Sequence, residues 1–210
     1  AEDVRQARLY VTACGLYELA INGKRVGDFV LAPGYTDYRK RIQYQTYDVT
    51  DLIRSGENEL TAELADGWYR GSCGAWGLRN QYGTQTKLLV QLELTDGAGK
   101  ISRICTDESW AWSNDGPIRF ADNKDGERVD AACTPSYCGR ARLATWNVVP
   151  TASNNVPLTE HGHFTNPKLI STPKGKTVLD FGQNIAGYVA FKIRARAGQK
   201  LTLRFGEMFD

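Results

Sequence analysis

The chain has 210 residues, of which 41% are apolar, and its formal net charge is +2. This length and composition suffice for one large or two small domains with a packed core. Lys and Arg are spread along the chain, so no basic patch indicates a nucleic acid or an anionic membrane as partner. No apolar run approaches the roughly 20 residues that span a bilayer. We therefore expect a globular protein that binds neither nucleic acid nor a membrane.

Cysteine and histidine use limits the possible metal and redox chemistry. The chain has five cysteines and two histidines. An odd number leaves at least one cysteine unpaired within the chain, and no His follows Cys133 and Cys138 at zinc spacing. We interpret the cysteines as reduced and mostly buried, which favours a cytoplasmic location and leaves a periplasmic or secreted one open.

The first 65 residues predict short strands joined by tight turns. Leu9 and Val11 alternate with polar neighbours, as in a half-buried strand. Asn22-Gly23 lies between two strand-like runs, and this pair is the strongest short signal of a type I′ hairpin. Further along we predict an exposed strand rich in Tyr and Thr at 42–49, a capped helical turn at 50–53 and a strand at 60–65.

Short strands continue to about residue 150 without a convincing long helix. They are predicted at 88–94, 101–105, 110–112 and 118–120, with a last one at 146–149. This pattern, at roughly ten-residue spacing, predicts an all-β fold of the sandwich or jelly-roll type.

The composition changes after Cys133, where Pro, Asn, Thr and Ser predict an extended connector. From Lys176 a second β pattern begins, with strands predicted at 177–181, 188–195 and 201–205. We therefore divide the chain into a first sandwich at 1–149, a connector at 150–173 and the start of a second, incomplete sandwich at 174–210.

Residues 65–83 (ADGWYRGSCGAWGLRNQYG) are too rich in Gly for a regular element and unusually aromatic. Aromatic faces stack on the apolar faces of sugar rings, and Arg79 and other polar residues could bind hydroxyl groups. The alternative is that the rings close one end of the sandwich core, since large aromatic residues usually pack inside. The candidate sugar-binding residues of this segment are Trp68, Tyr69, Trp76 and Arg79.

Residues 120–132 (FADNKDGERVDAA) are densely acidic. Such carboxylates repel one another unless a positive charge lies among them. Calcium prefers six to eight oxygen ligands, and sugar hydroxyls seek the same acceptors, so a calcium site, a sugar site or both are predicted here. The candidate metal ligands are Asp122, Asn123 and Asp125. The alternative is a solvated turn with Lys124 and Arg128 as counter-charges, because the spacing is not that of an EF-hand.

Five stretches together resemble the N-terminal part of bacterial α-L-rhamnosidases. They are GLYELAINGKRVGD (15–28), ADGWYRG (65–71), TDESW (106–110), DGERVDA (125–131) and DFGQNIAGYV (180–189), and they occur in the family's order. The resemblance implies a galactose-binding-like jelly roll up to about residue 150 and the opening strands of a second β-sandwich from about 174. It also implies a parent glycoside hydrolase whose catalytic (α/α)₆ toroid follows these sandwiches.

The same resemblance implies a role for Asp122 and Asn123. In some family members an Asp-Asn pair at this place contacts both calcium and rhamnose, so the pair is carried over as carbohydrate- and metal-binding, with Asn154, Asn155 or Asn166 as further candidate ligands. Where the family often has Arg after its Asp-Ala, this chain has Ala132, which removes a possible ion pair. Rhamnose-containing glycans or glycosides are the implied partners.

Three functions follow as hypotheses, and none makes the 210 residues an enzyme by themselves. The resemblance implies that the parent protein hydrolyses terminal α-L-rhamnosyl bonds with inversion. This reaction requires an acid and a base about 6.5–9.5 Å apart in environments that separate their pKa values, and one polar acidic stretch does not provide these. The chain is then a rhamnose-binding module dependent on calcium, a structural sandwich packed on the missing catalytic domain, or an accessory sandwich of another glycosidase. The first predicts calcium-sensitive binding of rhamnose, and the last predicts a preference for galactose.

Overall fold

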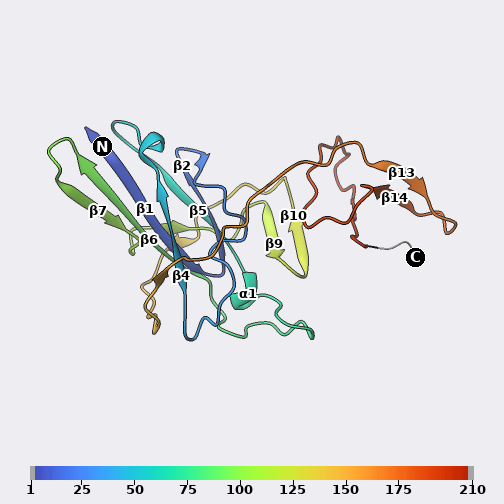
Figure 1. The fold of residues 1–210 in the computed structure, drawn as a ribbon, viewed down its shortest axis with the longest axis horizontal. Helices are drawn as coiled ribbons and strands as arrows, with labels where there is room; N and C mark the ends of the chain where they lie inside the picture. The colour runs from blue at the N-terminus through green and yellow to red at the C-terminus, as the bar shows by residue number, and fades with distance from the viewer. Residues whose placement is uncertain (1–2, 208–210) are drawn as a thin grey trace. The chain divides into compact units, whose positions relative to one another are not determined.

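The structure is a computed structural model that describes residues 3–207 (Figure 1). The chain divides into two compact units, the first ending at Glu160 and the second beginning at His161. This division falls inside the predicted connector. No helix among residues 3–207 is both long and apolar enough to cross a membrane.

The first unit consists almost entirely of strands. In chain order its elements are β1 (Val4–Cys14), β2 (Leu16–Ile21), β3 (Lys24–Arg25), β4 (Gln43–Asp48), the 3₁₀ turn η1 (Thr50–Leu52), β5 (Leu60–Ala65), α1 (Gly67–Arg70), β6 (Lys87–Asp96), β7 (Ile101–Cys105), β8 (Ala111–Trp112), β9 (Ile118–Asp122), β10 (Gly126–Val129), β11 (Gly139–Arg140) and β12 (Thr151–Ala152). A five-stranded sheet has the order β12-β4-β1-β6-β7, and a three-stranded sheet has the order β3-β2-β5. Two two-stranded sheets, β10-β9 and β11-β8, complete the unit.

The main core lies between the two larger sheets. Every second residue of β1 from Ala7 to Ala13 is almost fully buried, as expected when one face of a strand points inward. These side chains pack in one cluster with Val90 of β6 and with Leu19 and Ile21 of β2. The predicted all-β sandwich is therefore confirmed.

The hairpin predicted at Asn22-Gly23 is also confirmed. Asn22 has a φ of 53° and Gly23 a φ of 76°, and the flanking β2 and β3 pair antiparallel. Positive φ at both central residues is the requirement of a type I′ turn. The Asn22 side chain in addition donates to the carbonyl of Leu52 at 2.9 Å, which joins the turn to η1.

Strand β4 is not the exposed strand that its polar sequence predicted. It lies between β12 and β1, and its side chains Gln43 and Gln45 are buried. Their polar atoms have partners, because the Tyr17 hydroxyl donates to Gln45 Oε1 at 2.7 Å and Asn155 donates to Gln43 Oε1 at 2.9 Å. A buried amide costs little once it is hydrogen-bonded, and these partners are distant in sequence.

The last strand of the first unit was also predicted a few residues too early. Trp146 and Val148 form no strand and pack against a second buried cluster. The strand is β12, which follows Pro150 and pairs parallel with β4 at the edge of the large sheet. Proline lacks the N–H that a strand ladder requires, so the strand begins after it.

The second unit contains the strands β13 (Lys168–Ser171) and β14 (Thr177–Asp180), which pair antiparallel. The predicted strand at 177–181 is thus confirmed, whereas the strands predicted at 188–195 and 201–205 are not formed. Apolar residues of the first of these stretches, such as Phe191 and Ile193, are more than half exposed. A strand needs a hydrogen-bonded neighbour, and the described part of the chain offers none to these stretches.

The five cysteines are all free thiols in the structure. The expectation that they are mostly buried is wrong, since only Cys14 is buried and Cys105 and Cys138 are exposed. Burial raises the pKa of the Cys14 thiol, which keeps it protonated.

Candidate functional site

The acidic stretch forms a hairpin. Strand β9 ends at Asp122, β10 begins at Gly126, and these two residues are paired across the antiparallel ladder. Asn123, Lys124 and Asp125 make the turn between them. The hairpin gives each side chain of the acidic stretch a defined place.

Asp122 is completely buried at the root of this turn, with no exposed side-chain area. Its Oδ1 accepts hydrogen bonds from the backbone N–H groups of Lys124 and Asp125 at 2.8 and 2.9 Å. Its Oδ2 accepts from the N–H of Ser72 at 2.8 Å and from Arg79 Nη1 at 2.9 Å. Each carboxylate oxygen therefore has two donors, which fills the acceptor sites of an ionised aspartate.

These contacts hold Asp122 in its charged form. Burial alone raises the pKa of the carboxyl, but the hydrogen bonds from the N–H groups of Asp125, Ser72 and Lys124 and the charge of Arg79 outweigh it. The pKa of Asp122 consequently lies below the ordinary aspartate value.

Arg79 joins the hairpin to residues 65–83. Its Nη1 donates to Asp122 at 2.9 Å and to Asp125 Oδ2 at 3.1 Å, and its Nη2 donates to Asp66. Ser72 Oγ donates to Asp125, and Lys124 Nζ donates to the carbonyl of Gly74. We call this set of contacts the Arg79 clamp. Sequence reasoning assigned no role to Asp66 or Ser72, although Asp66 lies in one of the quoted family motifs.

The clamp depends on the absence of a side chain at Gly71. A Cβ at this position would overlap Asp122 Oδ2 and the Gly67 carbonyl. We expect Gly71→Ala to lower the free energy of unfolding by about 2 kcal/mol, measured by urea denaturation, because a buried carboxylate must shift. Gly116→Ala is the matched control, since its Cβ meets only Pro135 Cγ at 3.5 Å, and an equal loss there would contradict the explanation.

The predicted aromatic residues of 65–83 do not share one environment. Tyr69 is buried in the second core cluster with Cys14, Tyr38 and Ile42. Trp68 packs partly against that cluster, and its ring centroid lies 5.7 Å from that of exposed Tyr35. Trp76, in contrast, is 88% exposed. Only Trp76 of these three presents most of its ring to solvent, where a sugar could stack.

The asparagines that were candidate further ligands lie elsewhere. Asn154 Oδ1 accepts from Arg41 and from Gln43, each at 2.8 Å. Asn155 donates to Gln43, and Asn166 belongs to the second unit. Asn154 and Asn155 therefore bind residues at the start of β4, and they make no hydrogen bond to the acidic hairpin among the described residues.

The donors at the hairpin fit a calcium ion only in part. The Asp122 carboxylate is saturated by N–H donors and Arg79, so it does not fit as a ligand in this arrangement. Asn123 lies in the turn and is exposed. Within that same range no group of three His, Cys, Asp or Glu side chains is placed to hold a metal. The oxygen atoms that fit calcium as ligands at the hairpin are therefore those of amide and carbonyl groups.

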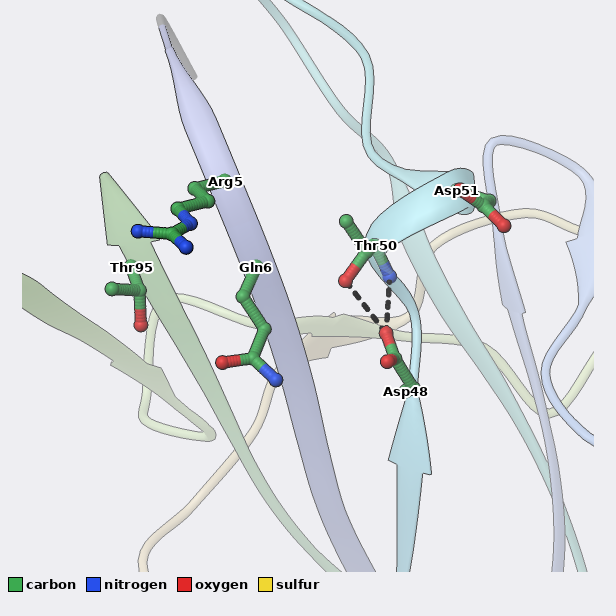
Figure 2. A pocket seen from close by; sticks show the side chains of 6 residues that line it. All are labelled: Arg5, Gln6, Asp48, Thr50, Asp51 and Thr95. Carbon is green, nitrogen blue, oxygen red and sulfur yellow. Dashed lines mark hydrogen bonds between the residues drawn. The ribbon is translucent and has the colours of Figure 1, made fainter. Parts of the chain in front are cut away.

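The cavity shown in Figure 2 is unrelated to these residues. It has a volume of about 750 Å³ and is lined by Arg5, Gln6, Asp48, Thr50, Asp51 and Thr95. Asp48 Oδ1 accepts hydrogen bonds from the N–H and the hydroxyl of Thr50 (Figure 2). The cavity is open and polar, and none of the predicted sugar-binding residues lines it.

Comparison with known proteins shows which protein family the chain resembles and which part of those proteins it matches. The family model of the α-L-rhamnosidase N-terminal domain matches residues 2–168, and that of the bacterial α-L-rhamnosidase concanavalin-like domain matches residues 170–210. An α-L-rhamnosidase of Streptomyces avermitilis is 42% identical over all of this chain and 21% of its own length. One from Formosa agariphila is 37% identical over all of this chain and 24% of its own length.

Solved structures give the same relation. The S. avermitilis α-L-rhamnosidase crystallised with L-rhamnose superposes with a TM-score of 0.79, covering 87% of this chain and 19% of that protein. The α-L-rhamnosidase of Aspergillus terreus superposes with a TM-score of 0.77 at 36% identity, covering 87% of this chain and 22% of that protein. The chain therefore spans about a fifth of the length of these relatives, and it belongs to the family of bacterial α-L-rhamnosidase N-terminal domains.

Proposed function

We propose that the whole protein hydrolyses terminal α-L-rhamnosyl bonds with inversion and that this chain contributes a non-catalytic part of it. Family membership supports the activity of the whole. The lowered pKa of Asp122 opposes a role as general acid, which must hold a proton near neutral pH. We expect the 210-residue chain to release no phenol from an aryl α-L-rhamnoside, and turnover by the pure chain would contradict this assignment.

We further propose that the first unit binds L-rhamnose at the surface that carries Asn123 and Trp76. The observation behind this proposal is that the Arg79 clamp ties their two segments together, while Asn123 and Trp76 remain exposed. The indole face can stack on the apolar face of the sugar, and the amide can bind its hydroxyl groups. Asn123 would hold a bound calcium ion through its amide oxygen, and the ion would supply positive charge to attract the sugar's hydroxyl oxygens, while Asp122 shapes the turn.

Calorimetric titration of the chain with millimolar L-rhamnose tests this proposal. We expect binding with a Kd near 1 mM, equivalent to about −4 kcal/mol, and at least a tenfold loss of affinity in Asn123→Ala and in Trp76→Ala. If rhamnose binding depends on calcium, the titration should give heat in the presence of calcium and none in the presence of EDTA. Asn147→Ala is the control, because Asn147 is exposed and lies outside both segments.

Two results would contradict this assignment. No heat at tens of millimolar rhamnose, with or without calcium, would leave the first unit without a sugar site. Stronger binding of D-galactose than of L-rhamnose would favour a different specificity.

A structural role is the second candidate, and exposed apolar side chains of the second unit favour it. Tyr188, Phe191 and Phe205 are each more than half exposed. Where such side chains form a contiguous apolar surface, that surface packs on other protein. We propose the rest of the parent protein, including its catalytic domain, as the partner. This role predicts that the longer protein protects these residues from solvent whether or not the first unit binds rhamnose.

We also propose a cytoplasmic location. Five free thiols, two of them exposed, are easiest to keep reduced in that compartment.

A further inference from the structure

The geometry points to Arg79 as a positioning residue for the proposed rhamnose site. We infer that its guanidinium fixes the 71–80 segment against the β9–β10 turn, so that Trp76 and Asn123 are held on one surface. This inference rests on the proposed function for the effect of Arg79 on rhamnose binding. The effect of Arg79 on the order of the β9–β10 turn does not depend on that function.

The contacts of Arg79 are those of a clamp. One guanidinium reaches three carboxylates: Asp66 before α1, Asp122 at the end of β9 and Asp125 in the turn. Its plane also approaches the Phe120 ring of β9, with 5.4 Å from the guanidinium carbon to the ring centroid. The linked residues are separated by 13 to 46 positions in the sequence, so the link is tertiary.

Arg79 has little left to offer a sugar. Three of its five N–H donors are engaged by the carboxylates, and its side chain is 33% exposed. Asn123 and Trp76, in contrast, have exposed side chains and take no part in the clamp. Arg79 therefore acts on the ligand through the residues it holds.

The planar fork of arginine is essential to this role. A lysine at position 79 would keep the positive charge, but its ammonium places all its donors on one atom. Arg79 instead reaches Asp122 and Asp125 from Nη1 and Asp66 from Nη2. Asp122 would then lose a donor on Oδ2, and the N–H groups of Ser72, Lys124 and Asp125 would lose a fixed acceptor.

The experiment compares Arg79→Lys with Arg70→Lys by NMR on the 210-residue chain. Arg70 pairs with the same Asp66 at 3.5 Å but contacts neither Asp122 nor Asp125, so it is the matched control. Two quantities are measured on each sample: the exchange rates of the Ser72, Lys124 and Asp125 amides, and rhamnose affinity from shift titration.

We expect Arg79→Lys to exchange these three amides at least tenfold faster and to bind rhamnose at least fivefold more weakly, with Arg70→Lys unchanged in both. Weaker binding with unchanged exchange would overturn the inference, because it would mean that Arg79 contacts the sugar directly. Faster exchange with unchanged affinity would also overturn it, since the clamp would then not position the site. If the wild-type chain binds no rhamnose, the proposed function fails, and the exchange rates still decide whether the clamp orders the turn.

Discussion

Replacing Asp122 by asparagine is expected to lower the free energy of unfolding by about 3 kcal/mol at pH 7. An asparagine can accept hydrogen bonds only through its single amide oxygen. If this oxygen faces Lys124 and Asp125, the NH₂ group points its hydrogens at the Ser72 N–H and at Arg79, and the reverse orientation fails in the same way. Urea denaturation at pH 7 measures the loss.

The pH dependence of stability gives a second readout of the same substitution. Because the folded-state pKa of Asp122 is lowered, its contribution is fully present above the unfolded value of about 3.9 and is lost as the pH falls through the folded pKa. The difference in stability between wild type and Asp122→Asn should therefore shrink as the pH is lowered below about 4.

The matched control for this prediction is Asp115→Asn. Asp115 also pairs with an arginine, Arg119 at 2.7 Å, but its side chain is 55% exposed. A solvent-exposed pair contributes less than about 1 kcal/mol. An equal loss in both variants would mean that Asp122 contributes as a surface charge and not as a buried acceptor.

Leu9→Ala is expected to cost about 3–4 kcal/mol, because it leaves a cavity between the two sheets of the first unit. Leu9 has no exposed area and is among the largest fully buried side chains. It packs in the cluster that joins β1 and β6 to β2. The loss is measured from the shift of the urea midpoint at constant m-value.

Leu143→Ala is the control for the core substitution, since Leu143 is 75% exposed and should change stability by less than about 0.5 kcal/mol. A loss below about 1 kcal/mol for Leu9→Ala would show that the sheets do not pack on this residue. Because Leu9 is not part of the clamp, the rhamnose affinity of the folded Leu9→Ala variant should equal that of wild type.

Local sequence determined several of the strands and indicated the family. The alternation around Leu9 and Val11 appears as the buried face of β1, and Asn22-Gly23 forms the predicted turn. Both depend on interactions within a few residues, namely the period of two of a strand and the tolerance of Asn and Gly for positive φ. Five short motifs in order were enough to indicate the rhamnosidase family, which the comparisons show.

Tertiary structure alone decided the roles of individual site residues. Composition could not distinguish buried Tyr69 from exposed Trp76, nor show that Gln43 and Gln45 of β4 lie inside. The carboxylate of Asp122 looked available to a ligand, and in the fold it is occupied by donors that include Ser72, 50 residues away in the sequence. Whether a polar group binds a ligand or supports the fold depends on which donors reach it, and those donors are brought together only by long-range packing.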